Sequence, residues 1–592
     1  MTHNATLQII FLFLILILIA PPIGYYIAGI YQGTIRPINR FLGPLEQILY
    51  RVCGIDPHRE MDWKQYLSAM LLLNALGFLV TYAIQRLQAT LPFNPQSFSE
   101  VPPLIAFNTA TSFVTNTNWQ AYAGEKTLSY FTQAGALTVQ QFISAATGMS
   151  LLMALIRGLI AEQKEHLGNF WVDTLRGILY VLLPLSCVLA LFLVSQGTIQ
   201  NTLPYQSIQP LQSFTAPSLS KPQGRASAHH NSEAPLSSAQ VQQLPMGPVA
   251  SQVAIKILGS NGGGFFNTNA AHPFENPSPL ACFVQLIGLL LIPVALCITF
   301  GSLVGDKRQG WAILITMLLL TLPLVYGTCI LENQTNPLLE GLPLIETANI
   351  EGKETRFGIT QSAIWATFTT ATSNGSVNAM LDAFMPLGGM IPLWLMQLGE
   401  VTFGGVGSGL SGMLVMVIIA VFIAGLMVGR TPEYLGKKIE PHDLKMACLA
   451  VLIPPLLIVL VTAIAVLNPL ALSASNASGP HGFTQVLYAF TSMVYNNGSA
   501  FSGLQADNDF YTVVGSICML IGRYGVAIPT LAMAGSLARK KKIATSAGTL
   551  LTHTPLFIGL LIAIVLLLGA LSFFPALSLG PIAEHFLLWE KT

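Results

Sequence analysis

Ser373-Asn374-Gly375-Ser376 and Asn496-Asn497-Gly498-Ser499 are two short polar loops, and each follows an apolar run long enough for a helix. Their approaches are also alike, Thr367-Phe368-Thr369-Thr370-Ala371-Thr372 and Ala489-Phe490-Thr491-Ser492. Two further loops of this kind occur earlier in the chain, Asn116-Thr117-Asn118-Trp119-Gln120 and Ser260-Asn261-Gly262-Gly263-Gly264. Four occurrences indicate one structural unit that is repeated four times.

The composition is typical of a membrane protein. Of the 592 residues, 52% are hydrophobic and 9% are charged, whereas about a quarter of a soluble domain is usually charged. The net charge is +1 and the basic residues lie in separate loops rather than in one patch, so nucleic acid is not expected as a partner. The seven cysteines have no C-x-x-C spacing and most lie in apolar runs, so we expect them to be packing residues without a disulfide or a metal.

The apolar segments predict the number of helices. The first, Leu7 to Ile27, has no basic region before it and no A-x-A cleavage site, which indicates a retained helix rather than a signal peptide. Further segments of roughly 20 residues, the length that crosses a bilayer, are centred near residues 75, 150, 183, 290, 320, 415, 457, 525 and 562. The sequence therefore predicts an all-α polytopic membrane protein with about ten transmembrane helices.

Lysine and arginine predict the orientation of the chain. Most of them lie in alternate loops, at Arg36 to Lys64, Arg157 and Lys164, Lys307 and Arg308, Arg430 to Lys445, and Arg539 to Lys542. Loops with an excess of positive charge face the cytoplasm. The N-terminus, the four polar loops and a Ser/Pro/Gln-rich stretch at 198–248 are then predicted to be extracytoplasmic.

Each repeat is predicted to contain a helix, a half-helix that re-enters the membrane, a polar loop and a second helix. Four such repeats would surround one pore with pseudo-fourfold symmetry, and one extra helix would lie at either end of the chain. The predicted divisions are 1–64 (N-terminal helix and cytoplasmic loop), 65–166 (repeat one), 167–308 (repeat two, with the extracytoplasmic loop 198–248), 309–438 (repeat three, with a broken helix), 439–542 (repeat four) and 543–592 (C-terminal helix).

The loops have the properties of an ion filter. Non-helical backbone at membrane depth must be buried in protein or line a water-filled cavity. Four loops on one axis would present a ring of carbonyl oxygens, which can replace the water shell of potassium without burying a charge. Glycine allows these carbonyls to point inwards because it tolerates positive φ. Gly262, Gly375 and Gly498 would hold this position, and Asn118 would replace glycine in the first repeat.

The candidate potassium filter, the only metal site expected, consists of Asn116, Asn118, Gln120, Ser260, Asn261, Gly262, Ser373, Asn374, Gly375, Asn497 and Gly498. We expect the side chains of Asn116, Gln120, Ser260 and Ser373 to line its mouth. The alternative is that the Asn-Gly pairs form ordinary turns between helices, which is their commonest use. Their repetition at matching positions favours the filter. A phosphate-binding loop at residues 262–264 is not expected, because no Gly-Lys-Ser/Thr follows.

Glu400 begins a glycine-rich stretch within the apolar run of the third repeat. A charge inside the membrane costs about 2.5 to 3.5 kcal/mol, so it needs a partner or a water-filled path. We interpret the stretch as a broken helix, in which Gly404 and Gly405 form a loop that obstructs the pore below the filter. Close helix packing through small residues is the alternative for the glycines.

Two basic residues also lie in apolar segments. Arg523 could repel an ion that continues straight through the pore, or it could form a structural ion pair with Glu400. Lys256 precedes the second loop and could lie near the filter mouth, or it could extend its charge to the surface as a snorkelling lysine.

Two longer motifs accompany the loops, Gly399-Glu400-Val401-Thr402-Phe403-Gly404-Gly405-Val406-Gly407 and Gly429-Arg430-Thr431-Pro432-Glu433-Tyr434-Leu435-Gly436-Lys437-Lys438. Together they closely resemble the KdpA family, the channel-like potassium-binding subunits of the bacterial Kdp ATPase, from the first helix to the last. The resemblance implies a complex in the bacterial inner membrane with a P-type ATPase catalytic subunit, a single-span assembly subunit and a small accessory helix. It also implies that the Gly404 loop diverts the ion into a tunnel towards the ATPase subunit, with Glu400 near the route.

The chain is not expected to have a catalytic site or a cofactor of its own, because it contains no Asp-Lys-Thr-Gly phosphorylation sequence and no Walker A loop. ATP and Mg²⁺ would bind to the partner subunit, and K⁺ would be the transported ion. The alternative is a stand-alone potassium uniporter or symporter built from the same four repeats. The two longer motifs and the extra terminal helices favour the pump.

Overall fold

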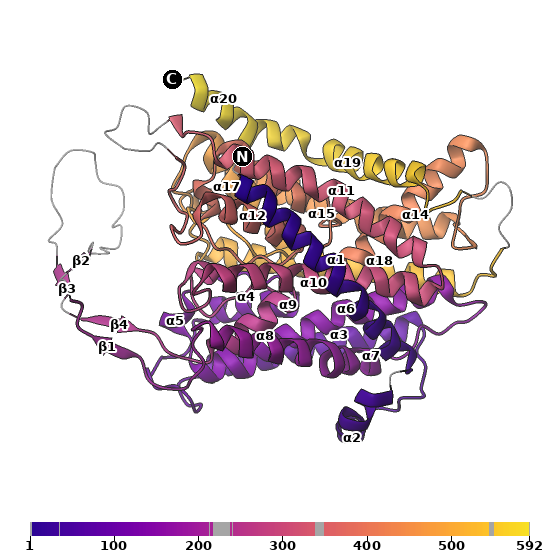
Figure 1. Cartoon of the computed structure of the whole chain (residues 1–592), viewed down its shortest axis with the longest axis horizontal. Coiled ribbons are helices and arrows are strands. Elements are labelled where there is room, and N and C mark those ends of the chain that lie inside the picture. Colours follow the sequence, from indigo (N-terminus) through magenta and orange to yellow (C-terminus); the bar gives the residue numbers. More distant parts are fainter. Residues whose placement is uncertain are drawn as a thin grey trace.

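The computed structural model is almost entirely helical (Figure 1) and describes residues 3–590 except 35, 212–213, 217–236, 240, 338–347 and 544–549. Within these described residues, ten helices are long and apolar enough to cross a membrane. Each predicted segment centre lies inside one of them. The prediction of an all-α polytopic membrane protein with about ten transmembrane helices is therefore confirmed.

The helices follow one order four times: a long helix, a short helix, a polar loop and a second long helix. The first repeat contains α3 (Trp63–Leu87), α4 (Pro103–Val114), η1 (Thr132–Thr138) and α6 (Val139–Ile160). The second contains α7 (Phe170–Arg176), η2 (Gly177–Leu182), α8 (Leu183–Ser195), α9 (Val249–Leu258) and α10 (Pro279–Val304). The third contains α11 (Lys307–Glu332), α12 (Gly358–Ala371), α13 (Pro386–Gln397) and α14 (Ser408–Val428). The fourth contains α15 (Pro441–Leu467), α17 (Gly479–Val494) and α18 (Asp509–Ala538).

The remaining elements lie at the ends of the chain and between the long helices. The terminal helices are α1 (His3–Gln32) and the run of α19 (Pro555–Leu577), η6 (Ser578–Ile582) and α20 (Ala583–Glu590). Shorter helices are α2 (Arg36–Cys53), α5 (Gly124–Thr127), α16 (Pro469–Leu472), η3 (Asn269–Ala271) and η5 (Leu381–Ala383).

The strands form three small antiparallel pairs. They are β1 (Gln206–Ile208) with β4 (Gln242–Leu244), β2 (Phe214–Ala216) with β3 (Ser237–Ala239), and β5 (Glu433–Tyr434) with β6 (Lys437–Lys438). In the first pair Gln206 lies opposite Leu244, and in the last Glu433 lies opposite Lys438. The first two pairs belong to the predicted polar loop 198–248, most of which lies outside the described residues. These two pairs extend from one end of the helix bundle (Figure 1).

The four short helices α4, α9, α12 and α17 lie in the same half of the bundle, towards the end that carries the β1–β4 pair (Figure 1). Each packs against neighbouring helices of its own repeat: α4 against α3 and α6, α9 against α8 and α10, α12 against α11 and α13, and α17 against α15 and α18. Since these contacts surround a helix of three or four turns, its polar C-terminal loop is held in the interior of the bundle.

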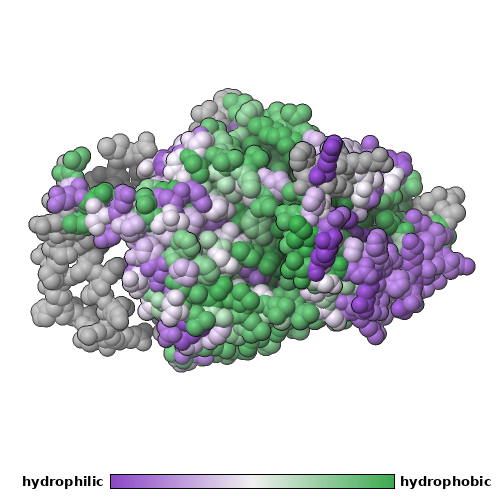
Figure 2. All heavy atoms as spheres, turned by 90° about the horizontal axis from the view of Figure 1, so that it is seen from below, coloured by the Kyte–Doolittle hydropathy of each residue, from purple (hydrophilic) through white to green (hydrophobic). Residues whose placement is uncertain are grey.

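The outer surface of the bundle is apolar. Large hydrophobic side chains are exposed on several long helices, including Leu18, Leu191, Leu456 and Leu571. Figure 2 shows a mainly hydrophobic surface across the middle of one face, with a hydrophilic region at one end. An exposed apolar surface of this extent would be unstable in water and is suited to contact with lipid.

Helix α1 packs closely along α10. The closest approach is at Gly24, where an added Cβ would lie 2.6 Å from the Ala295 carbonyl oxygen and 2.7 Å from the Cβ of Ile298. Glycine at this position therefore allows the N-terminal helix to dock on the second repeat.

We predict that Gly24→Leu lowers the apparent melting temperature of the detergent-solubilised protein. Inserting a side chain into a closely packed contact usually costs about 1–3 kcal/mol. Gly559→Leu on α19 is the matched control, because an added Cβ there meets no atom within 4 Å. Equal melting temperatures for the two variants would contradict the proposed α1–α10 contact.

Candidate functional site

The four polar loops meet and form a closed ring. Gly262 lies against the carbonyl oxygen of Asn374, Gly375 against that of Asn497, Gly498 against that of Thr117, and the side chain of Asn118 against that of Asn261. A Cβ at any of the three glycines would lie only 1.8–2.0 Å from the neighbouring oxygen, so no side chain fits there. The ring therefore runs from the second loop to the third, the fourth, the first and back to the second.

All four loops share one backbone conformation. Each has a positive φ at two positions, first at Asn116 (67°), Ser260 (49°), Ser373 (52°) and Asn496 (59°), and two residues later at Asn118 (52°), Gly262 (78°), Gly375 (80°) and Gly498 (95°). Asn118 thus has the left-handed conformation expected of a residue that replaces glycine. Asn496 was missing from the predicted set. Its sequence signal is its alignment with Ser373, one residue before the shared Asn-Gly pair.

The ring separates two cavities. The outer cavity, of about 510 Å³, is lined by Asn118, Gln120, Gly262, Gly375 and Gly498 among others. The inner cavity, of about 110 Å³, is lined by Asn116, Ser373, Asn496, Glu400 and Arg523 among others. Of the side chains expected at the mouth, Gln120 lines the outer cavity, whereas Asn116 and Ser373 lie on the opposite side of the ring.

Asparagine side chains connect neighbouring loops. The Asn116 Nδ2 donates to the Ser260 carbonyl at 2.8 Å, and the Asn374 Nδ2 donates to the Lys256 carbonyl at 2.9 Å. The Asn497 Nδ2 donates both to the Thr369 carbonyl at 3.2 Å and to Glu400 Oε1 at 2.9 Å. The asparagines therefore hold the loops in register and leave their backbone in the centre of the ring.

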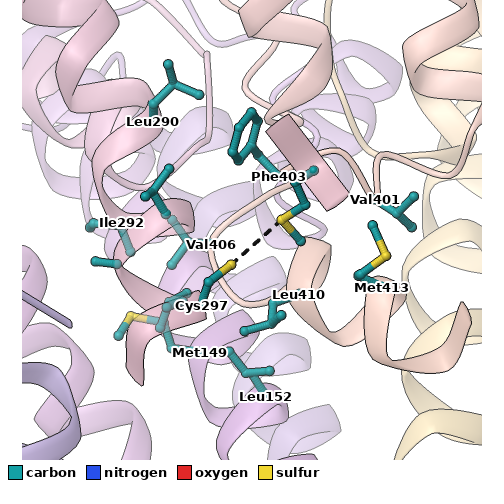
Figure 3. Close-up of a cluster of buried hydrophobic side chains, with 14 of the residues drawn as sticks. Met149, Leu152, Leu290, Ile292, Cys297, Val401, Phe403, Val406, Leu410 and Met413 are labelled. Atoms are coloured by element: carbon teal, nitrogen blue, oxygen red, sulfur yellow. Dashed lines mark hydrogen bonds between the residues drawn. The ribbon is translucent and has the colours of Figure 1, made fainter. Parts of the chain in front are cut away.

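The chain is not helical between α13 and α14, and this segment crosses beneath the third loop. The Gly404 amide donates to the Ala371 carbonyl at 2.8 Å, and an added Cβ on Gly405 would lie 3.4 Å from the Cβ of Ser373. Phe403 and Val406 insert into an apolar cluster that includes Leu290 of α10 (Figure 3). The break in the helix is therefore anchored by apolar side chains directly below the ring.

Glu400 and Arg523 line the inner cavity without forming a pair. Glu400 is 5% exposed and has a positive φ of 51°. Its carboxylate accepts from Asn497, and the Arg523 Nη2 donates to the Ser144 carbonyl at 3.3 Å. Among the described residues there is no ion pair between Glu400 and Arg523, so the structural bridge considered from the sequence is absent.

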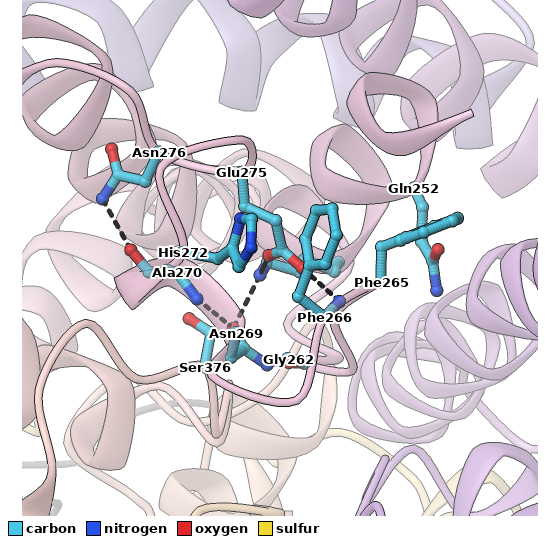
Figure 4. Close-up of polar contacts among 12 residues, drawn as sticks. Gln252, Gly262, Phe265, Phe266, Asn269, Ala270, His272, Glu275, Asn276 and Ser376 are labelled. Carbon is cyan, nitrogen blue, oxygen red and sulfur yellow. Dashed lines mark hydrogen bonds and ion pairs between the residues drawn. The ribbon is translucent and has the colours of Figure 1, made fainter. Parts of the chain in front are cut away.

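Lys256 is fully buried, which rules out the snorkelling arrangement considered from the sequence. Its ammonium group forms an ion pair with Glu275 and donates to the Asn269 Oδ1 at 2.6 Å. The Asn269 Nδ2 in turn donates to the Gly262 carbonyl at 2.6 Å (Figure 4). Sequence reasoning missed Asn269 and Glu275, although both follow the second loop in the polar segment that runs to Asn276.

His272 lies in the same polar segment after the second loop. The His272 ring stacks on Phe266 with ring centroids 3.7 Å apart and an interplanar angle of 7° (Figure 4). Burial lowers the pKa of His272 below its ordinary value. This shift favours the neutral form of the imidazole at pH 7.

The ring offers neutral backbone oxygens, which suit an ion that binds weakly enough to leave again. Within the described part of the chain, no group of three or more His, Cys, Asp or Glu side chains could hold a metal ion. The seven cysteines are all unpaired, and the Cys297 thiol lies 3.7 Å from the Met317 sulfur. The neutral backbone oxygens of the ring are suited to an alkali cation rather than to a transition metal.

A family model described as KdpA, Potassium-transporting ATPase A subunit, matches residues 10–586. The chain belongs to the KdpA family. The resemblance inferred from the loops and the two longer motifs is therefore confirmed, and the chain is a multi-pass membrane protein and a subunit of a potassium-transporting ATPase rather than its catalytic chain.

Similar KdpA-family proteins match over nearly their whole length. A "Potassium-transporting ATPase potassium-binding subunit" of Sorangium cellulosum is 55% identical over 593 residues, which is 99% of both chains. The subunit of the same name from Methylococcus capsulatus is 52% identical, again over 99% of both chains. The solved structure of the potassium transporter TrkH from Vibrio parahaemolyticus is 13% identical and covers 89% of this chain and 97% of its own, with a TM-score of 0.47.

We predict that Asn118→Val destabilises the protein more than Asn118→Gly does. Both variants lose the hydrogen bond from the Asn118 side chain to Asn261, so their difference reports the cost of a β-branched residue in this backbone conformation and in this buried position. A β-branched residue in the left-handed region costs roughly 1–2 kcal/mol, whereas glycine adopts it freely. Thermal unfolding in detergent measures the difference, and a valine variant as stable as the glycine variant would show that the first loop does not need this conformation.

Proposed function

We propose that this KdpA-family chain selects extracytoplasmic potassium in its four-loop ring and passes the ion to a P-type ATPase subunit for ATP-driven, high-affinity uptake. The observation that carries the proposal is the closed ring of backbone between an outer and an inner cavity. The names of the two relatives, potassium-binding subunits of potassium-transporting ATPases, support the choice of ion.

The ring carbonyls support ion binding directly. Among the described residues, none donates a hydrogen bond to the backbone oxygens of Thr117, Asn374, Gly375, Asn497 or Gly498. A buried carbonyl without a partner is costly, since more than about nine in ten buried backbone groups are paired. A dehydrated potassium ion would satisfy several of these oxygens at once.

Below the ring, the geometry favours a lateral exit for the ion. The non-helical segment between α13 and α14 lies across the axis, and the cation of Arg523 lies in the same cavity. That cavity is also lined by Pro454 of α15 and Ser572 of α19, two helices near the surface of the bundle. We infer that the ion leaves the axis between α14, α15 and α19, where the ATPase subunit would bind.

An ATPase partner is also expected on energetic grounds. A membrane potential of 100 mV provides about 2.3 kcal/mol per charge, and at about 1.4 kcal/mol per tenfold gradient this sustains a ratio of about forty. Uptake from micromolar potassium would require a larger concentration ratio than this. We infer a bacterial inner-membrane complex in which the partner subunit binds ATP and Mg²⁺, accompanied by a single-span assembly subunit and a small accessory helix, with the N-terminus of this chain extracytoplasmic.

We predict that Gly375→Val, and likewise Gly262→Val, raises the potassium concentration for half-maximal ATP hydrolysis by the complex at least about tenfold, the effect of losing about 1.4 kcal/mol of binding. The new side chain would displace the neighbouring carbonyl oxygen from the ring. Gly358→Val is the matched control, because Gly358 also has a positive φ (71°) but an added Cβ meets no atom within 4 Å. An unchanged half-saturating concentration in an assembled Gly375→Val complex would contradict the filter assignment.

We predict that Gln120→Arg weakens apparent potassium affinity more than Gln120→Met does. Neither arginine nor methionine can accept the hydrogen bond that the Gly264 amide donates to Gln120, but only arginine adds a cation at the outer cavity. The excess effect should shrink as ionic strength rises, because salt screens exposed charges. Uptake assays at micromolar potassium measure it, and equal affinities for the two variants would place Gln120 away from the ion's entry.

A further inference from the structure

The second loop is held differently from the other three. Each of its five carbonyl oxygens accepts a hydrogen bond from a different side-chain amide. The pairs are Ser260 with Asn116 (2.8 Å), Asn261 with Asn118 (2.7 Å), Gly262 with Asn269 (2.6 Å), Gly263 with Gln141 (2.8 Å) and Gly264 with Gln120 (2.9 Å). The corresponding carbonyls of Asn374, Gly375, Asn497 and Gly498 accept none among the described residues. In the other loops, side chains donate to the carbonyls of Trp119, Ser376 and Asn496. The second loop is therefore the one in which each of the five carbonyls is held by a side-chain amide.

The clamp on Gly262 depends on a buried ion pair. Asn269 can orient its amide in only one way, because its Oδ1 faces two donors, the Lys256 ammonium and the Ala270 amide. Its Nδ2 must then face the Gly262 carbonyl. Lys256 is held in turn by Glu275, whose other oxygen accepts from the Phe266 amide at 2.9 Å. The pair thus determines which atom Asn269 presents to the ring (Figure 4).

A buried ion pair is weak support for stability, because desolvating two charges offsets much of their attraction. Lys256 and Glu275 have no exposed side-chain surface. Glu275 also packs against the backbone of the loop itself, since an added Cβ on Gly264 would lie 2.7 Å from its Oε1. The position of the pair, behind and against the second loop, is better explained by orientation of that loop than by folding energy.

We propose that Lys256, Asn269 and Glu275 form a positioning unit that fixes the Gly262 carbonyl and makes the second loop the rigid wall of the filter. This inference rests on the proposed function of the ring. A rigid wall keeps the ring from closing around sodium, which is smaller than potassium, while the unclamped carbonyls of the other loops adjust to the ion that is bound. The side chains of Lys256 and Glu275 are fully buried, so they act on ion discrimination through Asn269, which lines the outer cavity.

The chain contains a matched control pair in its third repeat. Lys353 and Glu332 form an ion pair at 3.0 Å, and their side chains also have no exposed surface. Glu332 accepts from the Met385 amide and the Asn349 side chain, and Lys353 lies over the Phe384 ring. None of these partners belongs to the ring. Removing this pair tests what the loss of a buried ion pair does by itself.

The experiment compares Asn269→Gly and the double variant Lys256→Met/Glu275→Gln with the control Lys353→Met/Glu332→Gln. Glycine suits position 269 because Asn269 has a positive φ of 54°. ATP hydrolysis by each purified complex is titrated with potassium, rubidium and sodium. For Asn269→Gly and the Lys256/Glu275 variant, we expect the half-saturating potassium concentration to rise about tenfold and sodium to begin to stimulate hydrolysis. The control pair should retain the wild-type ion preference.

A wild-type preference for potassium over sodium in Asn269→Gly would overturn the positioning unit, and so would an equal loss of preference in the control pair. If the complex that carries Lys256→Met/Glu275→Gln does not assemble, the ion preference of Asn269→Gly alone tests the positioning unit. Gly375→Val separates this inference from the function on which it rests. If Gly375→Val weakens potassium binding and Asn269→Gly does not, the result supports the filter assignment and contradicts the positioning unit. If neither changes the affinity, the filter assignment itself fails.

Discussion

The structure depends on one close contact, which is made three times: the glycine of one loop lies against the carbonyl oxygen of the next, with no space for a Cβ. This contact is possible only with glycine at a positive φ, and the fourth junction replaces it with the side-chain amide of Asn118. The close contact between loops requires that four separate loops reach the same depth in the bundle. The short helices α4, α9, α12 and α17 meet that requirement because each ends where its loop begins.

The surroundings of the ring follow from its polar backbone. Unpaired carbonyls would be costly in lipid, so long helices enclose the loops, and their apolar outer surface faces the bilayer. On the inner side, the break between α13 and α14 brings Glu400 within hydrogen-bonding distance of the fourth loop, and Phe403 and Val406 anchor it in the apolar interior. The ring, the non-helical segment and the inner cavity thus form one continuous structure.

The sequence was sufficient for the features that depend on local pattern. The lengths of the apolar segments predicted ten helices, and glycine indicated the loop positions with positive φ. The lack of glycine in the first repeat identified Asn118 as its substitute. It was insufficient where distant residues meet. The burial of Lys256 depends on Glu275, 19 positions later in the chain, and on the turn at Asn269 that brings the two together. The placement of Asn116 and Ser373 on the inner side depends on the direction of each loop, which composition does not reveal.

We propose that this chain selects potassium for a pump rather than conducting it alone. The most direct test is ATP hydrolysis by the purified complex, titrated with potassium, rubidium and sodium, beside ion flux through this chain alone in liposomes. We expect hydrolysis that is stimulated by potassium only when the ATPase subunit is present, with little flux through the isolated chain. Potassium flux through the isolated chain, with no ATPase copurifying, would contradict it and indicate a uniporter.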